Sequence, residues 1–348
     1  MSIGVVMIAK NEELVIDRCL RSTASWAKAW VVHDTGSTDG TPQQVRDTAE
    51  RYGVSLVLNW DEWADFATNR NLALEAARKQ FPEVTYWLSL DADETALLAP
   101  DADPSKLEAD LVFVPMVADN TRFWAPRLIR ADGPCRWRGR CHEVPEGGHS
   151  TERWLGLEMH HHGGGHSSTE GRRMARNEML LRADLHDNPD DGRTIFYLAQ
   201  DLKAGGRHKE AIPLYKRRAE MGEVGSEEGW YAHYMLGVEQ LATGDRTGVD
   251  TLLRAANRRP WRAEPLADLC TYYWQQGCDE VARFFELAAD SLPFPVTDQL
   301  FIEDGLYDKS KRGDDPAPPS PVDLSREKGD LGPGFTARPP GGADENQF

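Results

Sequence analysis

The chain has 348 residues, of which 40% are hydrophobic and 28% are charged, and its formal net charge is −17. This length favours two domains with a sizeable buried core, and the composition excludes a disordered or fibrous chain. No stretch of 18 apolar residues occurs, and the first charged side chain is Lys10. These features exclude a membrane span, argue against a signal peptide and predict a cytoplasmic protein.

Cysteine usage and charge distribution narrow the classes further. The five cysteines are scattered, which predicts reduced thiols rather than a disulfide framework or a zinc site. Residues 120–262 carry 23 basic and 20 acidic side chains, whereas the segments on either side carry a net −10 each. An acidic chain argues against a general nucleic-acid binder, but its basic middle third can hold an anionic ligand locally.

Short apolar runs alternate with amphipathic segments over the first hundred or so residues. The apolar runs predict five buried strands at Ile3–Ala9, Trp30–His33, Ser55–Trp60, Tyr86–Leu90 and Leu111–Met116. Helical spacing predicts helices between them at Glu12–Ser22, Gly40–Tyr52 and Phe66–Gln80. This alternation predicts a doubly wound, mostly parallel α/β sheet with its ligand site at the carboxyl ends of the strands.

From about Asp191 the pattern is helical and repeats. Residues 196–215 align with 234–253 and 267–286, and the alignment superposes Gly206, Gly244 and Gly277. Each unit is predicted to be a helix, a glycine turn and a second helix, close to the 34-residue tetratricopeptide period. A generic helical domain would not explain three matching turn glycines. Residues 313–348 contain seven prolines and six glycines, which predicts a flexible tail.

Two motifs at predicted strand ends carry the chemistry. In LSLDADE (88–94), Asp91 and Asp93 follow a buried strand at i and i+2, so we expect them on one side of the strand end, where they can hold a divalent cation against a diphosphate. In VVHDTGSTDGT (31–41), Asp34 can accept a hydrogen bond from a base ring N–H, whereas the rest reads as a strand–turn–helix junction.

Together these motifs resemble family 2 glycosyltransferases, which have the GT-A fold. The resemblance covers roughly residues 3–145 and rests on the order and spacing of four motifs: IAKNE (8–12), VVHDTGSTDGT (31–41), Asn69-Arg70-Asn71 and LSLDADE (88–94). The helical repeats are similar to those of a bacterial subgroup that joins this domain to tetratricopeptide repeats. One departure is that His33-Asp34-Thr35 has a single acid where the family commonly has two, which affects the expected base selectivity.

The resemblance implies a role for particular residues. Ala9 and Asn11 would border the nucleotide pocket, Asp34 would contact the base, and Arg70 would lie near the base or the diphosphate. Asp91 would sit by the ribose and the metal, and Asp93 would be a direct metal ligand. The cofactors would be Mn²⁺ or Mg²⁺ and a nucleotide-sugar donor, with a UDP-sugar favoured.

The segment 122–143 contains six arginines and ends in His142-Glu143. In GT-A enzymes the segment after the acidic motif builds the acceptor side, and Glu143 matches the acid that acts there as base. An inverting transfer needs such a carboxylate next to the acceptor nucleophile. An exposed turn residue is the alternative for Glu143, and Asp132 is the weaker candidate base. The arginines would either clamp an anion or lie solvated on a strand.

The segment MHHHGGGH (159–166) carries four histidines. Runs of histidine bind transition metals or lie in polar loops, and similar sequences have a His-x-Gly here that returns to the metal. This resemblance implies His161 as a metal ligand, with His162 in the neighbouring register.

We therefore predict a GT-A domain over residues 1–166, a tetratricopeptide-like repeat domain over 167–312 and a tail over 313–348. The predicted function is metal-dependent, inverting transfer of a sugar to a macromolecular acceptor, with a polypeptide side chain favoured. Transfer to a hydroxylated base in DNA, such as hydroxymethylcytosine, is the alternative acceptor, and a non-catalytic repeat scaffold is the alternative class. The repeats would bind the acceptor or mediate self-association, and no membrane partner is expected.

Overall fold

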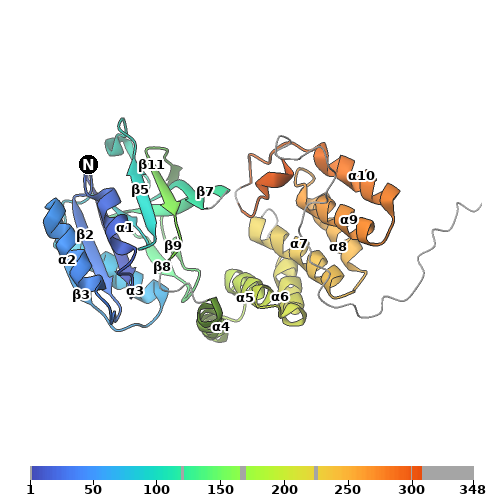
Figure 1. Ribbon diagram of the computed structural model, residues 1–348, viewed down its shortest axis with the longest axis horizontal. Coiled ribbons are helices and arrows are strands. Elements are labelled where there is room, and N and C mark those ends of the chain that lie inside the picture. Colours follow the sequence, from blue (N-terminus) through green and yellow to red (C-terminus); the bar gives the residue numbers. More distant parts are fainter. Residues whose placement is uncertain (1, 119–120, 165–169, 223–225, 299, 308–348) are drawn as a thin grey trace, which may run out of the picture.

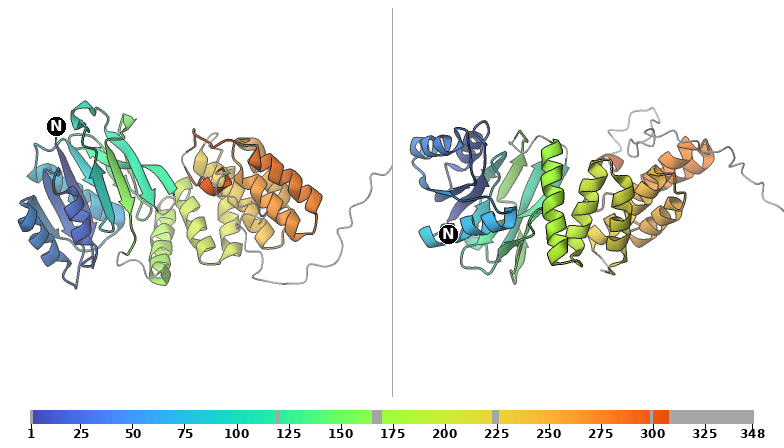
Figure 2. Two further views of the ribbon diagram at one scale, coloured as in Figure 1. Left: turned by 45° about the horizontal axis from the view of Figure 1, so that its top comes forward. Right: turned by 90° about the horizontal axis from the view of Figure 1, so that it is seen from below.

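The computed structural model describes residues 2–118, 121–164, 170–222, 226–298 and 300–307. A sheet domain is followed by a stack of helices, and the two parts lie end to end in an elongated molecule (Figure 1). The views in Figure 2 show the helices extending away from the sheet domain in one direction. Among the described residues, none of the helices is long and apolar enough to cross a membrane.

The sheet domain has a parallel half that carries the predicted strands. Its strand order is β3-β2-β1-β4-β7-β6-β11-β5, and β10 pairs with β6. The parallel strands are β1 (Ile3–Ala9), β2 (Ala29–Asp34), β3 (Ser55–Trp60) and β4 (Tyr86–Ser89). The other half is mixed and contains β5 (Glu94–Leu98), β6 (Leu111–Ala118), β7 (Thr121–Arg130), β10 (Thr151–Arg153) and β11 (Leu157–His161). A separate hairpin pairs β8 (Arg136–Arg138) with β9 (Val144–Glu146).

Helices cover both faces of the parallel half. On one face, α1 (Ile16–Thr23) and α2 (Thr41–Tyr52) pack on strand residues such as Val5 and Val32. On the other face, α3 (Phe66–Gln80) packs on Val6 and Val31. Successive strand residues point to opposite faces, so continuous apolar strands are the expected consequence of this double covering.

The remaining helices form hairpins behind a first helix, α4 (Glu170–Asp187). The pairs are α5 (Gly192–Ala204) with α6 (His208–Glu220), α7 (Glu227–Ala242) with α8 (Gly248–Arg258), and α9 (Glu264–Gln275) with α10 (Asp279–Asp290). Gly206, Gly244 and Gly277 occupy the turns with φ of 72°, 82° and 68°. This left-handed conformation explains the repeated glycine, because other residues reach it at an energetic cost.

The predicted fold class is therefore confirmed: a GT-A-like α/β domain precedes an all-α, tetratricopeptide-like repeat domain. The predicted domain boundary after residue 166 and the tail at 313–348 both lie outside the described residues. One helix start was wrong, because α1 begins at Ile16 and not at Glu12. Asn11 has a φ of 57°, and the amide of Glu12 donates to Thr41 Oγ1 at 2.7 Å, so this segment is tied to the start of α2 instead of being helical.

Candidate functional site

The carboxyl ends of β1, β2 and β4 form the edge that carries the predicted site. Ala9 and Asp34 are register partners at the ends of β1 and β2, and the Ala9 carbonyl accepts a hydrogen bond from the Thr35 amide at 2.9 Å. Asn11 links the loops that follow β1 and β2. Its backbone amide donates to Ser37 Oγ at 2.9 Å, and its side-chain Oδ1 accepts from the backbone amide of Thr38 at 2.7 Å. The backbone and the side chain of Asn11 therefore hold these two loops together.

The side chain of Asp34 is buried, and only one of its two carboxylate oxygens has hydrogen-bond partners. Its Oδ1 accepts hydrogen bonds from the amides of Gly36 and Ser37 at 3.0 and 2.8 Å. Its Oδ2 is buried without a hydrogen-bond partner. Because a buried acceptor without a donor is energetically unfavourable, this oxygen suits a ligand N–H such as that of a nucleobase.

A buried arginine joins two other predicted site residues. Arg70, on α3, donates from Nη2 to Asp91 Oδ1 at 2.7 Å and from Nε to Glu143 Oε1 at 2.6 Å. The Arg70 and Glu143 side chains are 8% and 11% exposed, so Glu143 is not a solvated turn residue. The Arg70 guanidinium also lies 5.1 Å from the ring centre of Trp137. From the sequence, Arg70 is expected near the base or the diphosphate, and its pairing with Glu143 is not predicted.

The electrostatics follow from this burial. Burial opposes the charged form of Arg70, but Asp91 and Glu143 outweigh it and raise the pKa of Arg70. Burial likewise opposes ionisation of Asp91, yet Arg70 and Arg127 hold the pKa of that carboxyl well below its ordinary value. Asp91 is therefore a permanent anion between two permanent cations.

Glu94 and Arg127 complete the cluster and were not singled out from the sequence. Arg127, on β7, donates to Glu94 Oε1 at 2.7 Å and to Asp91 Oδ2 at 3.4 Å. Glu94 Oε2 accepts from the Asp91 amide at 2.9 Å. Burial raises the pKa of Glu94 to about 7 even though Arg127 opposes the shift. The third acid of the LSLDADE motif was the signal that could have identified Glu94.

Asp93 faces a different partner from Asp91. Its Oδ1 lies 3.7 Å from His161 Nδ1 at the end of β11. The neighbouring His162 instead places Nε2 2.8 Å from Thr95 Oγ1. Strand alternation cannot place these two acids, because β4 ends at Ser89 and both lie beyond it; Asp91 contacts Arg70 and Arg127, whereas Asp93 faces His161.

The pair Asp93 and His161 fits a divalent cation. Ligand atoms about 2.1 Å from one metal ion can be up to about 4 Å apart, which accommodates the observed 3.7 Å. Both oxygens of Asp91 face arginines, so Asp91 is a poorer direct ligand. Within the part of the chain that the structure describes, no three His, Cys, Asp or Glu side chains form a preassembled metal site. Diphosphate oxygens and water would have to supply the other ligands.

The weaker candidate base, Asp132, lies away from this edge. It is 77% exposed and pairs with Arg130 at 2.7 Å. Arg130 is the register partner of Tyr86, the first residue of β4, so it marks the opposite edge of the sheet from Asp91. Other arginines of the segment also pair with carboxylates: Arg136 with Glu75, Arg138 with Glu146 and Asp191, and Arg140 with Asp184 and Asp187.

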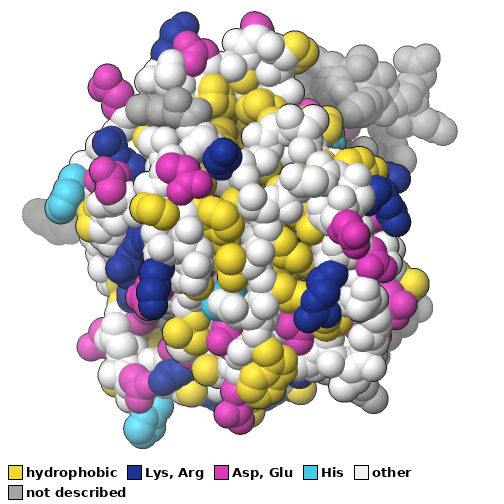
Figure 3. All heavy atoms as spheres, turned by 90° about the vertical axis from the view of Figure 1, so that its left-hand side faces the viewer, with side chains coloured by type: hydrophobic (Ala, Val, Ile, Leu, Met, Phe, Trp, Pro, Cys, Tyr) yellow, Lys and Arg dark blue, Asp and Glu magenta, His cyan; other side chains and the backbone are white. Residues whose placement is uncertain are grey.

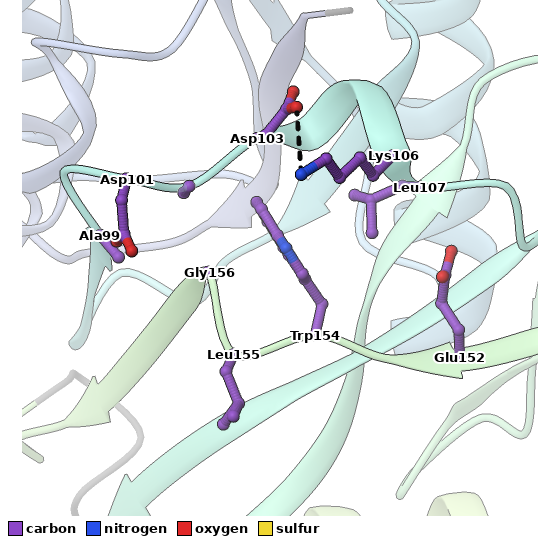
Figure 4. A pocket seen from close by; sticks show the side chains of 10 residues that line it. Ala99, Asp101, Asp103, Lys106, Leu107, Glu152, Trp154, Leu155 and Gly156 are labelled. Atoms are coloured by element: carbon purple, nitrogen blue, oxygen red, sulfur yellow. Dashed lines mark ion pairs between the residues drawn. The ribbon is translucent and has the colours of Figure 1, made fainter.

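A cavity of about 370 Å³ lies elsewhere on the sheet domain. Trp154 and Lys106 line it, and Lys106 forms an ion pair with Asp103 at 3.8 Å (Figure 4). The cavity is next to the paired residues Leu98 and Leu157, whereas Glu94 and His161 pair at the other end of the same two strands. It is therefore separate from the candidate site.

Fold and site together define a class: an α/β domain with an acidic cluster at the strand ends, followed by helical-hairpin repeats. The comparisons with known proteins agree, because residues 4–99 match the family Glycosyl transferase family 2. Residues 4–99 of the N-terminal domain are thus similar to the family 2 glycosyltransferases.

Similar proteins were found for both parts of the chain. A TPR repeat-containing protein of Synechococcus elongatus is 26% identical over 278 residues, which cover 74% of this chain and 66% of that protein. The chain therefore spans slightly less than two thirds of this relative. The structure of S. aureus TarS residues 1–349 in complex with UDP is 13% identical, with a TM-score of 0.42 over 75% of this chain and 92% of that one. The structure of MamA AMB-1 is 22% identical, with a TM-score of 0.31 over 35% and 71%. Neither structural likeness is close enough to carry an argument.

The raised pKa of Glu94 predicts how stability depends on pH. Between its unfolded pKa of 4.5 and its folded pKa of about 7, the folded chain binds the extra proton, so this group's contribution to the free energy of unfolding decreases as pH rises. The total decrease should be about 3 kcal/mol. Glu94→Gln, which cannot ionise, should remove it. Protonation of Asp91 does not affect the free energy of unfolding between pH 4.5 and 7. Because the pKa of Asp91 is lowered in the folded chain, its contribution to stability is lost only below pH 3.8.

The measurement is urea denaturation of the wild type and Glu94→Gln at steps between pH 4.5 and 8. Asp132→Asn, which replaces an exposed carboxylate of the same domain, is the matched control. Parallel stability curves for wild type and Glu94→Gln would contradict the prediction.

Proposed function

We propose that this chain is a metal-dependent, inverting glycosyltransferase that moves a sugar from a UDP-sugar to a polypeptide side chain. The observation that carries the proposal is the convergence of Asp34, Arg70, Asp91 and Glu143 on one edge of the sheet, with Arg70 paired to both of the last two. We further propose a cytoplasmic location, supported by five cysteines that are free in the structure.

Each residue has a chemical role in this proposal. The unpartnered Oδ2 of Asp34 accepts a hydrogen bond from the base, next to the backbone of Ala9 and Asn11. Arg70 lies near the diphosphate, and Asp91 lies near the ribose. Glu143 takes the proton of the acceptor nucleophile as that nucleophile attacks the sugar carbon and the nucleoside diphosphate departs. Attack opposite the departing group inverts the configuration of that carbon.

Charge supports the metal requirement. The two buried arginines face three carboxylates, those of Asp91, Glu94 and Glu143, and Asp93 lies just beyond them. The arginines are therefore already neutralised and cannot by themselves balance an incoming diphosphate. Asp93 and His161 would hold Mn²⁺ or Mg²⁺ here, and the cation would supply charge stabilisation to the leaving diphosphate.

The donor prediction follows from this arrangement. A panel of nucleotide-sugars, assayed for diphosphate release with and without Mn²⁺, should show metal-dependent release from a UDP-sugar. Asp93→Ala should lower turnover about a hundredfold or more, because a catalytic cation contributes several kcal/mol. Asp103→Ala removes a carboxylate at the distant cavity and is the control for folding and stability. Full wild-type turnover in chelator, or by Asp93→Ala, would remove the metal from the proposal.

The base prediction concerns Glu143. Glu143→Gln should keep the shape of the side chain and donor binding but lower transfer by about a hundredfold or more, the typical effect of losing a general base. Donor affinity would be measured by calorimetry with UDP, and transfer by release of UDP in the presence of acceptor. Wild-type transfer by Glu143→Gln would restrict Glu143 to holding Arg70.

The acceptor prediction separates a polypeptide from modified DNA. Arginines of the basic segment pair with carboxylates, and positive and negative side chains are interspersed on the end of the sheet domain seen in Figure 3. Such a surface offers few free cations for counterion release, so binding to hydroxymethylated duplex should be weak and depend only shallowly on salt. The measurement is a salt titration of binding to this duplex and to unfolded polypeptide. Steep salt dependence together with glycosylated bases would favour DNA as the acceptor.

A further inference from the structure

The loop that carries Glu143 is held by the repeat domain. The side chain of Cys141 is buried in the core formed by the helices. The ring of His142 stacks on Tyr197 of α5, with ring centres 4.2 Å apart and planes 10° apart. The carbonyl of His142 accepts a hydrogen bond from Arg193 Nε at 3.3 Å. The two residues before Glu143 are thus fixed by contacts from outside the sheet domain.

The backbone of this loop needs such support. His142 has a φ of 52°, in the left-handed region that a non-glycine residue adopts only at an energetic cost. A residue keeps this conformation when its surroundings determine it. Arg193 adds to the support, because its guanidinium lies 4.7 Å from the Tyr197 ring centre and also pairs with Glu228 of α7. The direction of Glu143 therefore depends on a conformation that α5 stabilises.

A second connection reaches Arg70. The carbonyl of Arg140 accepts a hydrogen bond from the amide of Phe66, the first residue of α3, at 3.2 Å. The amide of Arg140 donates to Asp184 Oδ2 of α4 at 2.8 Å. Arg176 of α4 lies 5.0 Å from the ring centre of Phe66. Arg70 is one helical turn beyond Phe66, so α4 helps to fix the start of the helix that presents it.

We propose that the first helices of the repeat domain are part of the active site, and that Tyr197 is a positioning residue that sets Glu143 against Arg70. The inference rests on the proposed function, and it assigns the repeats a role in the chemistry besides any contact with the acceptor. Tyr197 touches neither substrate nor the reacting atoms; it acts through His142. Losing the ring releases the strained backbone and lets Glu143 move away from the nucleophile.

The kinetic test uses full-length variants. Tyr197→Ala should lower kcat for transfer by about ten- to hundredfold, the cost of a misplaced catalytic group, while KM for the donor changes much less. Tyr197→Phe keeps the stacking ring and should restore most of kcat. Tyr273→Ala is the matched control, because Tyr273 stacks on Phe285 in the third hairpin, with ring centres 5.7 Å apart and planes 9° apart. It should lower thermal stability but leave kcat unchanged.

A second readout separates this inference from the proposed function. Burial raises the pKa of the Cys141 thiol to about 12, so in the wild type this thiol should resist alkylation. Tyr197→Ala should increase alkylation of Cys141 by iodoacetamide, mapped by mass spectrometry, whereas Tyr273→Ala should not. A wild type that is inactive with every donor would overturn the proposed function, and alkylation would still decide whether the repeats hold the loop.

Three results would overturn the inference. They are unchanged kcat in Tyr197→Ala, equal losses of kcat in Tyr197→Ala and Tyr273→Ala, and unchanged alkylation of Cys141 in Tyr197→Ala.

Discussion

The arrangement of the site depends on one buried cation. The Arg70 guanidinium contacts Asp91 on the turn after β4 and Glu143 on a loop 73 residues further along than Arg70. The Arg70 side chain is 8% exposed, so its charge depends on these carboxylates, because an unpaired buried charge costs several kcal/mol. Arg127 likewise forms ion pairs with two carboxylates, those of Asp91 and Glu94. Two carboxylates from the segment after β4 and one from the loop between β8 and β9 are therefore held together by two guanidinium groups.

The sheet explains why these groups can meet. Parallel strands end at the same edge, so the turn after β4 lies beside the loops that follow β1 and β2. The helix α3 packs against the same strands and directs Arg70 toward that edge. β7 runs antiparallel beside β4 and contributes Arg127 from the other side. The mixed half of the sheet thus adds a side chain to a site that lies at the strand ends of the parallel half.

Much of this could be predicted from periodicity, and the rest could not for identifiable reasons. Apolar runs located β1 and β3 to the residue, and the turn glycines located the hairpins, because both signals are local. The pairing of Arg70 with Glu143 is not local and depends on the left-handed backbone of His142, which no residue preference announces. The positions of Asp91 and Asp93 could not be predicted from strand alternation either, because β4 ends at Ser89 and both acids follow it. The excess of arginines was visible in the sequence, but their carboxylate partners lie on other elements.

The contact between the two domains differs in kind from the site. Its ion pairs are partly exposed: the Arg138 and Arg140 side chains are 49% and 34% accessible, and pairs open to solvent contribute little to stability. The firmer contacts are the buried side chain of Cys141 and the ring of His142 lying flat on Tyr197. Both belong to the loop that ends in Glu143. The buried contacts between the domains are therefore made by the two residues that precede the candidate base. The proposed position of this base depends on the repeats as well as on the sheet domain.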